Sequence, residues 1–195
     1  MDIDTSLRDI ALLLSRLTLG GSIASHGAQK MFGVLGGPGL KATAESMESL
    51  GFSPGGRYAP MVAATEMTSG MLMMLGAFGP VAPAMLLSVM VVAIETVHKP
   101  KGYFAQNGGY EMNTMYILNA VLLANEGYGA YSVDEMLAVR TKLRPIHGWL
   151  TLLAGAAGAM LVLSQRSQSG GQQSAEKSAH KNETAATDSE IGAAV

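Results

Sequence analysis

Three ionisable side chains interrupt long apolar segments of the sequence: Arg16, Glu66 and Glu95. Such a side chain inside a membrane-spanning helix costs about 2.5 to 3.5 kcal/mol on insertion scales, so it is normally paired, directed inward and functional. At about 1.5 Å per helical residue, Glu66 is expected about 9 Å, and Arg16 about 18 Å, below the same membrane face. Because long side chains can close most of that gap, an Arg16–Glu66 ion pair is the expected arrangement, with Glu95 nearer the surface.

Further polar residues are expected at that same face. They end the first apolar segment or border the stretch AIETVHKPKGYFAQNGGYEMN, and together they predict a polar pocket of Arg16, His26, Lys30, Glu66, Glu95, His98, Glu111 and Asn113. A quinone or proton-relay site needs a donor to a quinone carbonyl and a titratable partner, which histidine and glutamate supply. The alternative is a structural ion pair that sets helix register, beside ordinary interfacial histidines.

Other chemistries have less support in the residues present. His26 and His98 could ligate a b-type haem. No further haem-binding pattern accompanies these two histidines, so haem is not the expected cofactor. The methionines at 67, 71, 73 and 74 could offer thioethers to copper(I), yet methionine at helical spacing is usually a flexible filler of the core. The absence of cysteine excludes thiolate catalysis, zinc–thiolate sites and iron–sulfur clusters. No run of lysine and arginine indicates nucleic-acid binding.

The elements that would position these residues are apolar segments of membrane-spanning length. Only 14% of the 195 residues are charged, against about 25% in soluble domains, and a bilayer core needs about 20 mostly apolar residues in a helix. We predict spans at 10–28, 60–78, 81–97 and 112–125, and a fifth helix of marginal length at 148–163. The expected fold class is an all-α membrane protein, a four-helix transmembrane bundle with an additional C-terminal helix, and its first partner is the lipid bilayer.

Alternation of the spans places the loops at 29–59 and 98–111 and the C-terminal tail on one face of the membrane. The N-terminus, the turn at 79–80 and the loop at 126–147 belong to the other face. Within the first loop, LKATAESMESLG predicts a short amphipathic helix that ends at Gly51 and lies in the interface. Glycines near the pocket are predicted to have structural roles in turns and close approaches, namely Gly27, Gly36, Gly37, Gly108 and Gly109.

Composition also divides the chain into segments. An N-terminal segment (1–9) precedes the four-helix membrane domain (10–137), and a linker with the fifth helix follows (138–164). From residue 165 to 195 the sequence turns to Ser, Gln, Gly, Ala, Glu and Lys. Such a segment cannot bury enough apolar surface to offset the entropy of ordering it, so a disordered polar tail is predicted.

Three ordered motifs resemble the DoxX family of small bacterial membrane proteins. RLTLGGSIASHGAQKMFGVLGGPGLKATAESMESLGFSPG is similar to the N-terminal signature of that family, with an arginine in the first helix, HGxxKxFG, a GGxG turn and LGxxPG. ATEMTSGMLMMLGAFGPVAPAML resembles its second hairpin, and VMVVAIETVHKPKGYFAQNGGYEMN its third block. The likeness runs from about residue 10 to 137, and it departs from the pattern at Met112, where an aromatic residue is usual.

The resemblance implies a multi-pass four-helix bundle in the bacterial cytoplasmic membrane. Some family members are similar to a subunit of a thiosulfate:quinone oxidoreductase, and others associate with redox-stress proteins. The resulting hypothesis is an accessory subunit of a quinone-linked redox system, with quinone as the candidate cofactor and other subunits of a redox complex as partners. The alternative is a non-catalytic membrane scaffold, or a small-solute or lipid-handling protein, that anchors soluble redox-stress partners.

Overall fold

The computed structural model describes residues 3–138 and 145–166, and every regular element in those two ranges is helical. The α-helices are α1 (Ile3–Phe32), α2 (Gly39–Ser49), α3 (Gly55–Leu75), α4 (Val81–Ala93), α5 (Glu111–Glu126), α6 (Val133–Met136) and α7 (Pro145–Ser164). Between α4 and α5 lie a π-helical turn (Ile94–His98) and two 3-10 turns (Lys99–Lys101, Ala105–Asn107). The predicted all-α class is confirmed for these residues, whereas nearly all of the predicted tail and most of the linker before α7 lie outside them.

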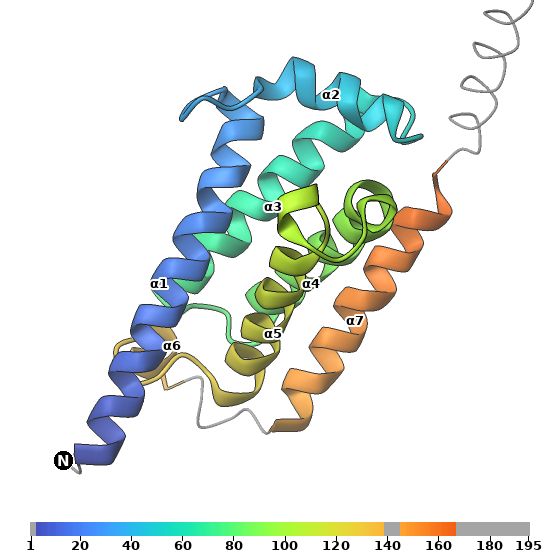
Figure 1. The fold of residues 1–195 in the computed structure, drawn as a ribbon. Coiled ribbons are helices and arrows are strands. Elements are labelled where there is room, and N and C mark those ends of the chain that lie inside the picture. Colours follow the sequence, from blue (N-terminus) through green and yellow to red (C-terminus); the bar gives the residue numbers. More distant parts are fainter. Residues whose placement is uncertain (1–2, 139–144, 167–195) are drawn as a thin grey trace, which may run out of the picture.

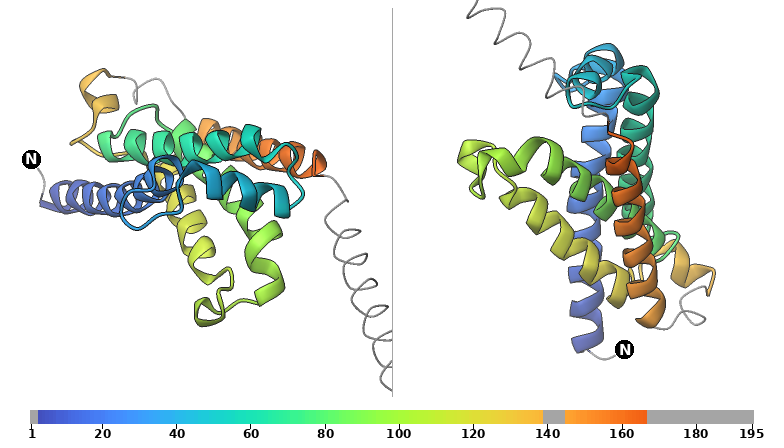
Figure 2. Two further views of the ribbon diagram at one scale, coloured as in Figure 1. Left: turned by 90° about the horizontal axis from the view of Figure 1, so that it is seen from above. Right: turned by 90° about the vertical axis from the view of Figure 1, so that its right-hand side faces the viewer.

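The helices pack side by side, with α2 lying across one end (Figure 1). α1 and α3 run alongside each other, α4 and α5 pack next to them, and α7 packs against α4 and α5. The N-terminus and α6 lie at the end opposite α2 (Figure 1). In two further views, α4 and α5 lean away from α1 as they approach the turn that joins them (Figure 2). This arrangement follows the alternation of loops expected from the sequence.

Two helical segments in the described part of the chain are long and apolar enough to cross a membrane. They are Val81–Lys101, which continues α4 through the two turns that follow it, and Ile146–Ser164 in α7. The fifth segment, expected to be marginal, therefore meets the requirement. α5 has only 16 residues, and α3 includes Glu66 with several Gly, Ser and Thr residues. A bundle of four spanning helices thus stays a prediction.

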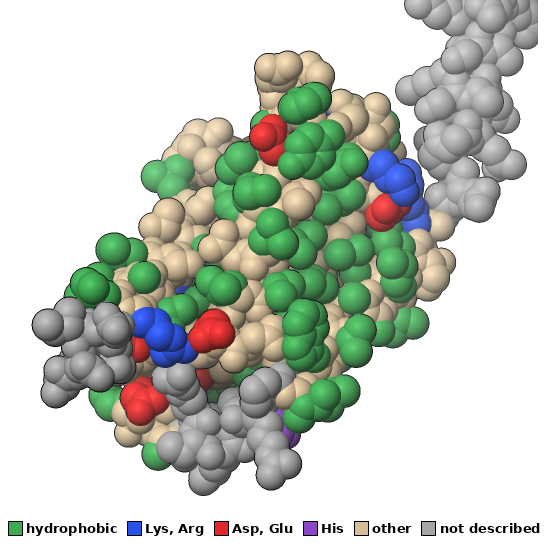
Figure 3. Space-filling model, turned by 60° about the horizontal axis from the view of Figure 1, so that its bottom comes forward, with side chains coloured by type: hydrophobic (Ala, Val, Ile, Leu, Met, Phe, Trp, Pro, Cys, Tyr) green, Lys and Arg blue, Asp and Glu red, His purple; other side chains and the backbone are tan. Residues whose placement is uncertain are grey.

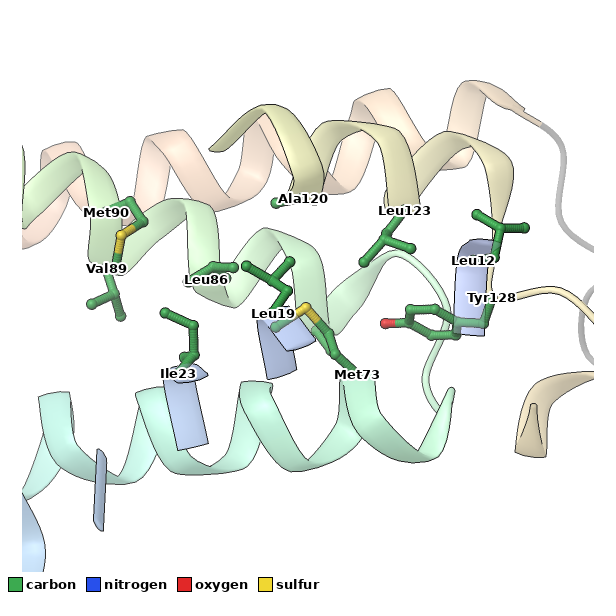
Figure 4. Packing of buried hydrophobic residues seen from close by; sticks show 11 residues of the cluster. Leu12, Leu19, Ile23, Met73, Leu86, Val89, Met90, Ala120, Leu123 and Tyr128 are labelled. Carbon is green, nitrogen blue, oxygen red and sulfur yellow. The ribbon is translucent and has the colours of Figure 1, made fainter. Parts of the chain in front are cut away.

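The core and the outer surface are both apolar. Large side chains from α1, α3, α4 and α5, with Tyr128 after α5, form the main buried cluster (Figure 4). Hydrophobic side chains are also spread widely over the face seen in Figure 3, where charged side chains are few. Leu14, Leu118 and Leu153, from three different helices, are each more than half exposed. A surface of this kind is unfavourable in water and suits contact with lipid chains.

Arg16 does not pair with Glu66, so the ion pair expected from the sequence is wrong. The side chain of Arg16 is only 2% exposed. Its guanidinium donates to the carbonyl oxygens of Met73 and Met74 in the last turn of α3 and to that of Tyr131. Carbonyl groups in a last turn have no partner within their helix, and the helix dipole favours a cation there. Arg16 therefore closes the C-terminal end of α3.

The register of the antiparallel helices α1 and α3 explains this outcome. Gly20 lies against Gly70, and Gly27 lies against Ala63. Continuing the same register along α1 brings Arg16 to the last turn of α3. Glu66 lies about two turns earlier on α3, or about 12 Å along its axis. The sequence estimate gave an offset of about 9 Å, so the two residues are further apart than expected, and carbonyl groups lie within closer reach of Arg16.

The junction between α2 and α3 depends on a carboxylate outside the apolar segments. The carboxylate of Glu48 accepts a hydrogen bond from the Ser53 hydroxyl at 2.6 Å and another from the backbone N–H of Gly55, the first residue of α3. Both bonds favour the charged form, and they hold the pKa of Glu48 below its usual value, the Ser53 bond having the larger effect. The junction is therefore expected to respond to acid.

Because the pKa of Glu48 is lower in the folded state, its stabilising effect is complete above the unfolded pKa of about 4.3 and is lost as the pH falls through the folded pKa. We expect Glu48→Gln to lower the thermal midpoint in detergent by a few degrees at pH 7, with the difference from wild type vanishing in acid. Glu45→Gln, on the same helix, is the matched control. A deficit in Glu48→Gln that does not shrink as the pH is lowered below about 4.3 would contradict the role of the charge.

Candidate functional site

A cavity of about 520 Å³ lies at the α2 end of the molecule, between α1, α2 and α3 on one side and α4, the π-helical turn and α5 on the other. Its walls are mostly apolar. Five residues of the predicted polar pocket line it together, from three separate helices and the π-helical turn: His26, Lys30, Glu66, His98 and Asn113. These five polar residues thus lie together at one end of the bundle, as expected from the sequence.

Lys30 and Glu66 form the ionic centre of the cavity wall. The Nζ atom of Lys30 lies 2.6 Å from Oε2 of Glu66, and their side chains are 27% and 6% exposed. Lys30 lies in the last turn of α1, one turn beyond His26, and its long side chain reaches Glu66 on α3. A buried carboxylate needs such a partner, because an unpaired charge in a low-dielectric site is costly. The pair is electrically neutral as a unit.

His98 is held in one orientation by the turn that follows it. Its Nδ1 atom lies 2.7 Å from the carbonyl oxygen of Gly108. Since a carbonyl oxygen only accepts, Nδ1 must donate, and the Nε2 atom of a neutral His98 then has a free lone pair. The residue ends a π-helical turn, a rare element that occurs frequently at functional sites. His98 can therefore accept a hydrogen bond from a ligand hydroxyl.

His26 has a similar arrangement on α1. The amide nitrogen of Gln29 donates to the carbonyl oxygen of Leu35 at 3.1 Å, which directs the amide oxygen toward His26. The Nδ1 atom of His26 lies 3.1 Å from that oxygen and donates to it. His26 is exposed at the edge of the cavity, so it lies where the cavity meets the outside.

The remaining wall is adaptable and polarisable. Met47, Met61, Met90 and Met112 line it from four different helices, and the amide of Asn113 donates to the sulfur of Met90 at 3.4 Å. Thioethers fill irregular space and make favourable contacts with aromatic rings. A flat ring with a few polar substituents fits such a wall.

Three members of the predicted pocket lie elsewhere. Arg16 closes α3 at the opposite end of the molecule. Glu95 pairs with Lys99 four residues later, at 2.8 Å and largely exposed. The carboxylate of Glu111 accepts a hydrogen bond from the backbone N–H of Ala105 at 2.9 Å. Glu95 and Glu111 thus serve local structure, because each finds a partner within a few residues along the chain.

The predicted structural glycines lie where a side chain would be unfavourable. Gly36 and Gly108 have φ values of +72° and +75°, a region that favours glycine. A Cβ at Gly27, Gly37 or Gly109 would overlap neighbouring atoms, which for Gly27 are the backbone of α3. Gly108 also presents the carbonyl group that orients His98, so its conformation contributes directly to the cavity.

Sequence reasoning missed several polar residues of the cavity. Tyr116 lines it, and its hydroxyl lies 3.0 Å from that of Ser22. Thr65 and Tyr58 line it from α3. The signal for Tyr116 was present, because it follows Asn113 by three residues and so shares its helix face.

The described residues contain no group of three or more His, Asp or Glu side chains placed to hold a metal ion. His26 and His98 do line the same cavity. The haem alternative therefore stays a prediction that an absorption spectrum of the purified protein tests.

In the described residues every regular element is helical, the outer surface is largely apolar, two helices are suited to crossing a membrane and a cavity lies at one end, which is the arrangement of a helical membrane protein. A family model described as DoxX matches residues 11–99, so this part of the chain carries a DoxX domain, as its motifs predicted. The match ends at Lys99, so it covers α1 to the π-helical turn, whereas α5 and α7 lie beyond it. Comparisons with curated proteins and with solved structures found no match.

Proposed function

We propose that the cavity binds the head group of a quinone or quinol, and that the protein is a multi-pass accessory subunit of a quinone-linked redox system in the bacterial cytoplasmic membrane. One observation carries this proposal: the cavity is mostly apolar, and its ionic groups, Lys30 and Glu66, neutralise each other. A net charge on the ligand would therefore have no counter-charge. A neutral ring with a few hydrogen-bonding oxygens matches the wall in polarity.

The polar groups can serve both redox forms of such a ligand. The Lys30 ammonium can donate to a quinone carbonyl oxygen while it keeps Glu66 as its ion partner. The Nε2 lone pair of neutral His98 can accept from a quinol hydroxyl, and Nδ1 stays bonded to Gly108. His98 and Glu66 are then the residues that would take up protons from a quinol as its electrons pass to a partner subunit.

Binding to the purified full-length protein tests this function. With a chain-free benzoquinone as probe in equilibrium filtration, we expect His98→Ala to weaken binding of the quinol form by about five- to tenfold, the usual effect of one lost hydrogen bond. Asn113→Leu should weaken binding of the ring as well. Asn119→Leu, on the same helix but outside the cavity lining, is the matched control and should leave binding unchanged.

Three outcomes would contradict the proposal. The first is a wild-type protein that binds neither redox form, which would favour the non-catalytic scaffold instead. The second is an equal effect of the two asparagine variants, since that would indicate binding outside the cavity. The third is a Soret band in the spectrum of the purified protein, which would assign the two histidines to haem.

A further inference from the structure

Three hydrogen-bonded pairs join α1 to α5 along one seam. Arg8 bonds to Glu126 at 2.5 Å, Ser15 to Asn119 at 3.2 Å, and Ser22 to Tyr116 at 3.0 Å. The three residues of α1 are seven positions apart, or two helical turns, so they lie on one face of the helix. The seam is thus closed from the α6 end of the molecule up to Ser22.

The series of bonds stops at the level of the cavity. The next residue on that face of α1 is Gln29, which bonds to Leu35 and His26 instead of to α5. At this level α5 leans away from α1 (Figure 2, right). His26 on α1 and Met112 on α5 both line the cavity, and both are exposed, Met112 by 50%. Exposed side chains of both helices therefore border the cavity on this side.

The opposite side of the cavity is closed by the end of α7. The hydroxyl of Tyr58 donates to Gln165 at 3.0 Å, and Arg166 donates to the carbonyl oxygen of Leu50 at 2.5 Å. These two bonds connect α7 to the junction of α2 with α3, beside Val162, which lines the cavity. Among the described residues, hydrogen bonds bridge this side of the cavity, whereas the bonds between α1 and α5 end at Ser22.

We infer that the ligand is an amphiphile with a neutral head, whose apolar chain leaves the cavity through the opening between α1 and α5 bounded by His26 and Met112. This inference rests on the proposed function for the nature of the head group, and it adds the route of the chain. Outside the opening, Met115, Leu118 and Leu122 expose an apolar surface on α5. A chain emerging there meets apolar side chains instead of charged ones.

The route is tested with two benzoquinones that differ only in a ten-carbon chain, bound to the full-length protein in nanodiscs. Met112→Trp should narrow the opening, and the affinity for the chain-bearing probe should fall at least about tenfold relative to that for the chain-free probe, since each methylene kept from burial costs about fourfold. Met71→Trp, at a position 51% exposed on α3 and outside the cavity lining, should leave both affinities unchanged. A selective loss in Met61→Trp instead of Met112→Trp would overturn the route.

A second probe separates this inference from the proposed function. A ten-carbon primary alcohol with a terminal diazirine carries a neutral head and a chain, but no quinone ring. Photolabelling that excess unlabelled alcohol displaces should fall within residues 22–30 and 109–116, and Met112→Trp should reduce it. Labelling confined to α3 and α7 overturns the route whether or not quinones bind. Failure of the chain-free benzoquinone to bind, with labelling at the opening intact, overturns only the quinone head group.

Discussion

Replacing Lys30 by methionine should lower the free energy of unfolding by about 3 kcal/mol, because it leaves the carboxylate of Glu66 without its partner. The side chain of Glu66 is only 6% exposed, and Lys30 Nζ is its ion partner at 2.6 Å. The variant must therefore either bury an unpaired charge or protonate the carboxyl group. Reversible unfolding in mixed micelles measures the loss.

Two further variants make this prediction specific. Lys30→Met combined with Glu66→Leu removes both charges and should recover most of the stability, since apolar groups of similar volume often replace a buried ion pair without cost. The exposed pair of Lys99 with Glu95 is the control, and Lys99→Met should cost less than about 1 kcal/mol. Equal losses in Lys30→Met and Lys99→Met would show that the cavity pair is effectively solvated.

Replacing Gly27 by alanine should destabilise the protein by about 1 to 3 kcal/mol or more, the range for overpacking a close contact. A Cβ at this position would lie 2.7 Å from the carbonyl oxygen of Ala63 and would overlap the backbone of Met67. Backbone atoms cannot move aside as a flexible side chain can, so α1 and α3 would have to separate. Thermal unfolding in detergent measures the effect.

Gly21, another glycine of α1, provides the control for this prediction. A Cβ at Gly21 would have only the sulfur of Met74 within reach, at 4.0 Å. Gly21→Ala should therefore be neutral or stabilising by up to about 1 kcal/mol, because alanine favours the helix. If both variants had the same thermal midpoint, the close packing of α1 on α3 would be contradicted. Loss of quinone binding in Gly27→Ala would follow from the displacement of Lys30 relative to Glu66.

Much of the candidate site could be predicted from the sequence because its residues carry a local signal. Glu66 and His26 lie within apolar segments, and Lys30 and His98 follow the ends of such segments. Each of these residues lies toward one end of its helix. Because successive helices run in opposite directions, those ends meet at the same end of the bundle, and the convergence of the residues could be predicted. Five of eight predicted pocket residues accordingly line one cavity.

The predictions that failed concerned which group each charged side chain would bond to. Arg16 was assigned to Glu66 from estimated depth, but it bonds to carbonyl groups at the end of α3. Glu95 and Glu111 were assigned to the pocket from their position, but each is held by a nearby residue. Charge alone does not select among several partners within reach, and a backbone carbonyl at a helix end leaves no mark in the sequence.

The sequence by itself determined the resemblance to DoxX proteins, the all-helical class of the described residues and the end of the molecule at which polar residues gather, because apolar segments and short motifs are local properties of the chain. Only the tertiary structure decided which residues face one another. Lys30 rather than Arg16 reaches Glu66, the turn at Gly108 orients His98, and α5 leans away from α1 toward the end where Met112 lines the cavity. These features arise from many weak contacts between distant segments, and a shift of one helical turn, about 5.4 Å, would exchange every partner along the interface.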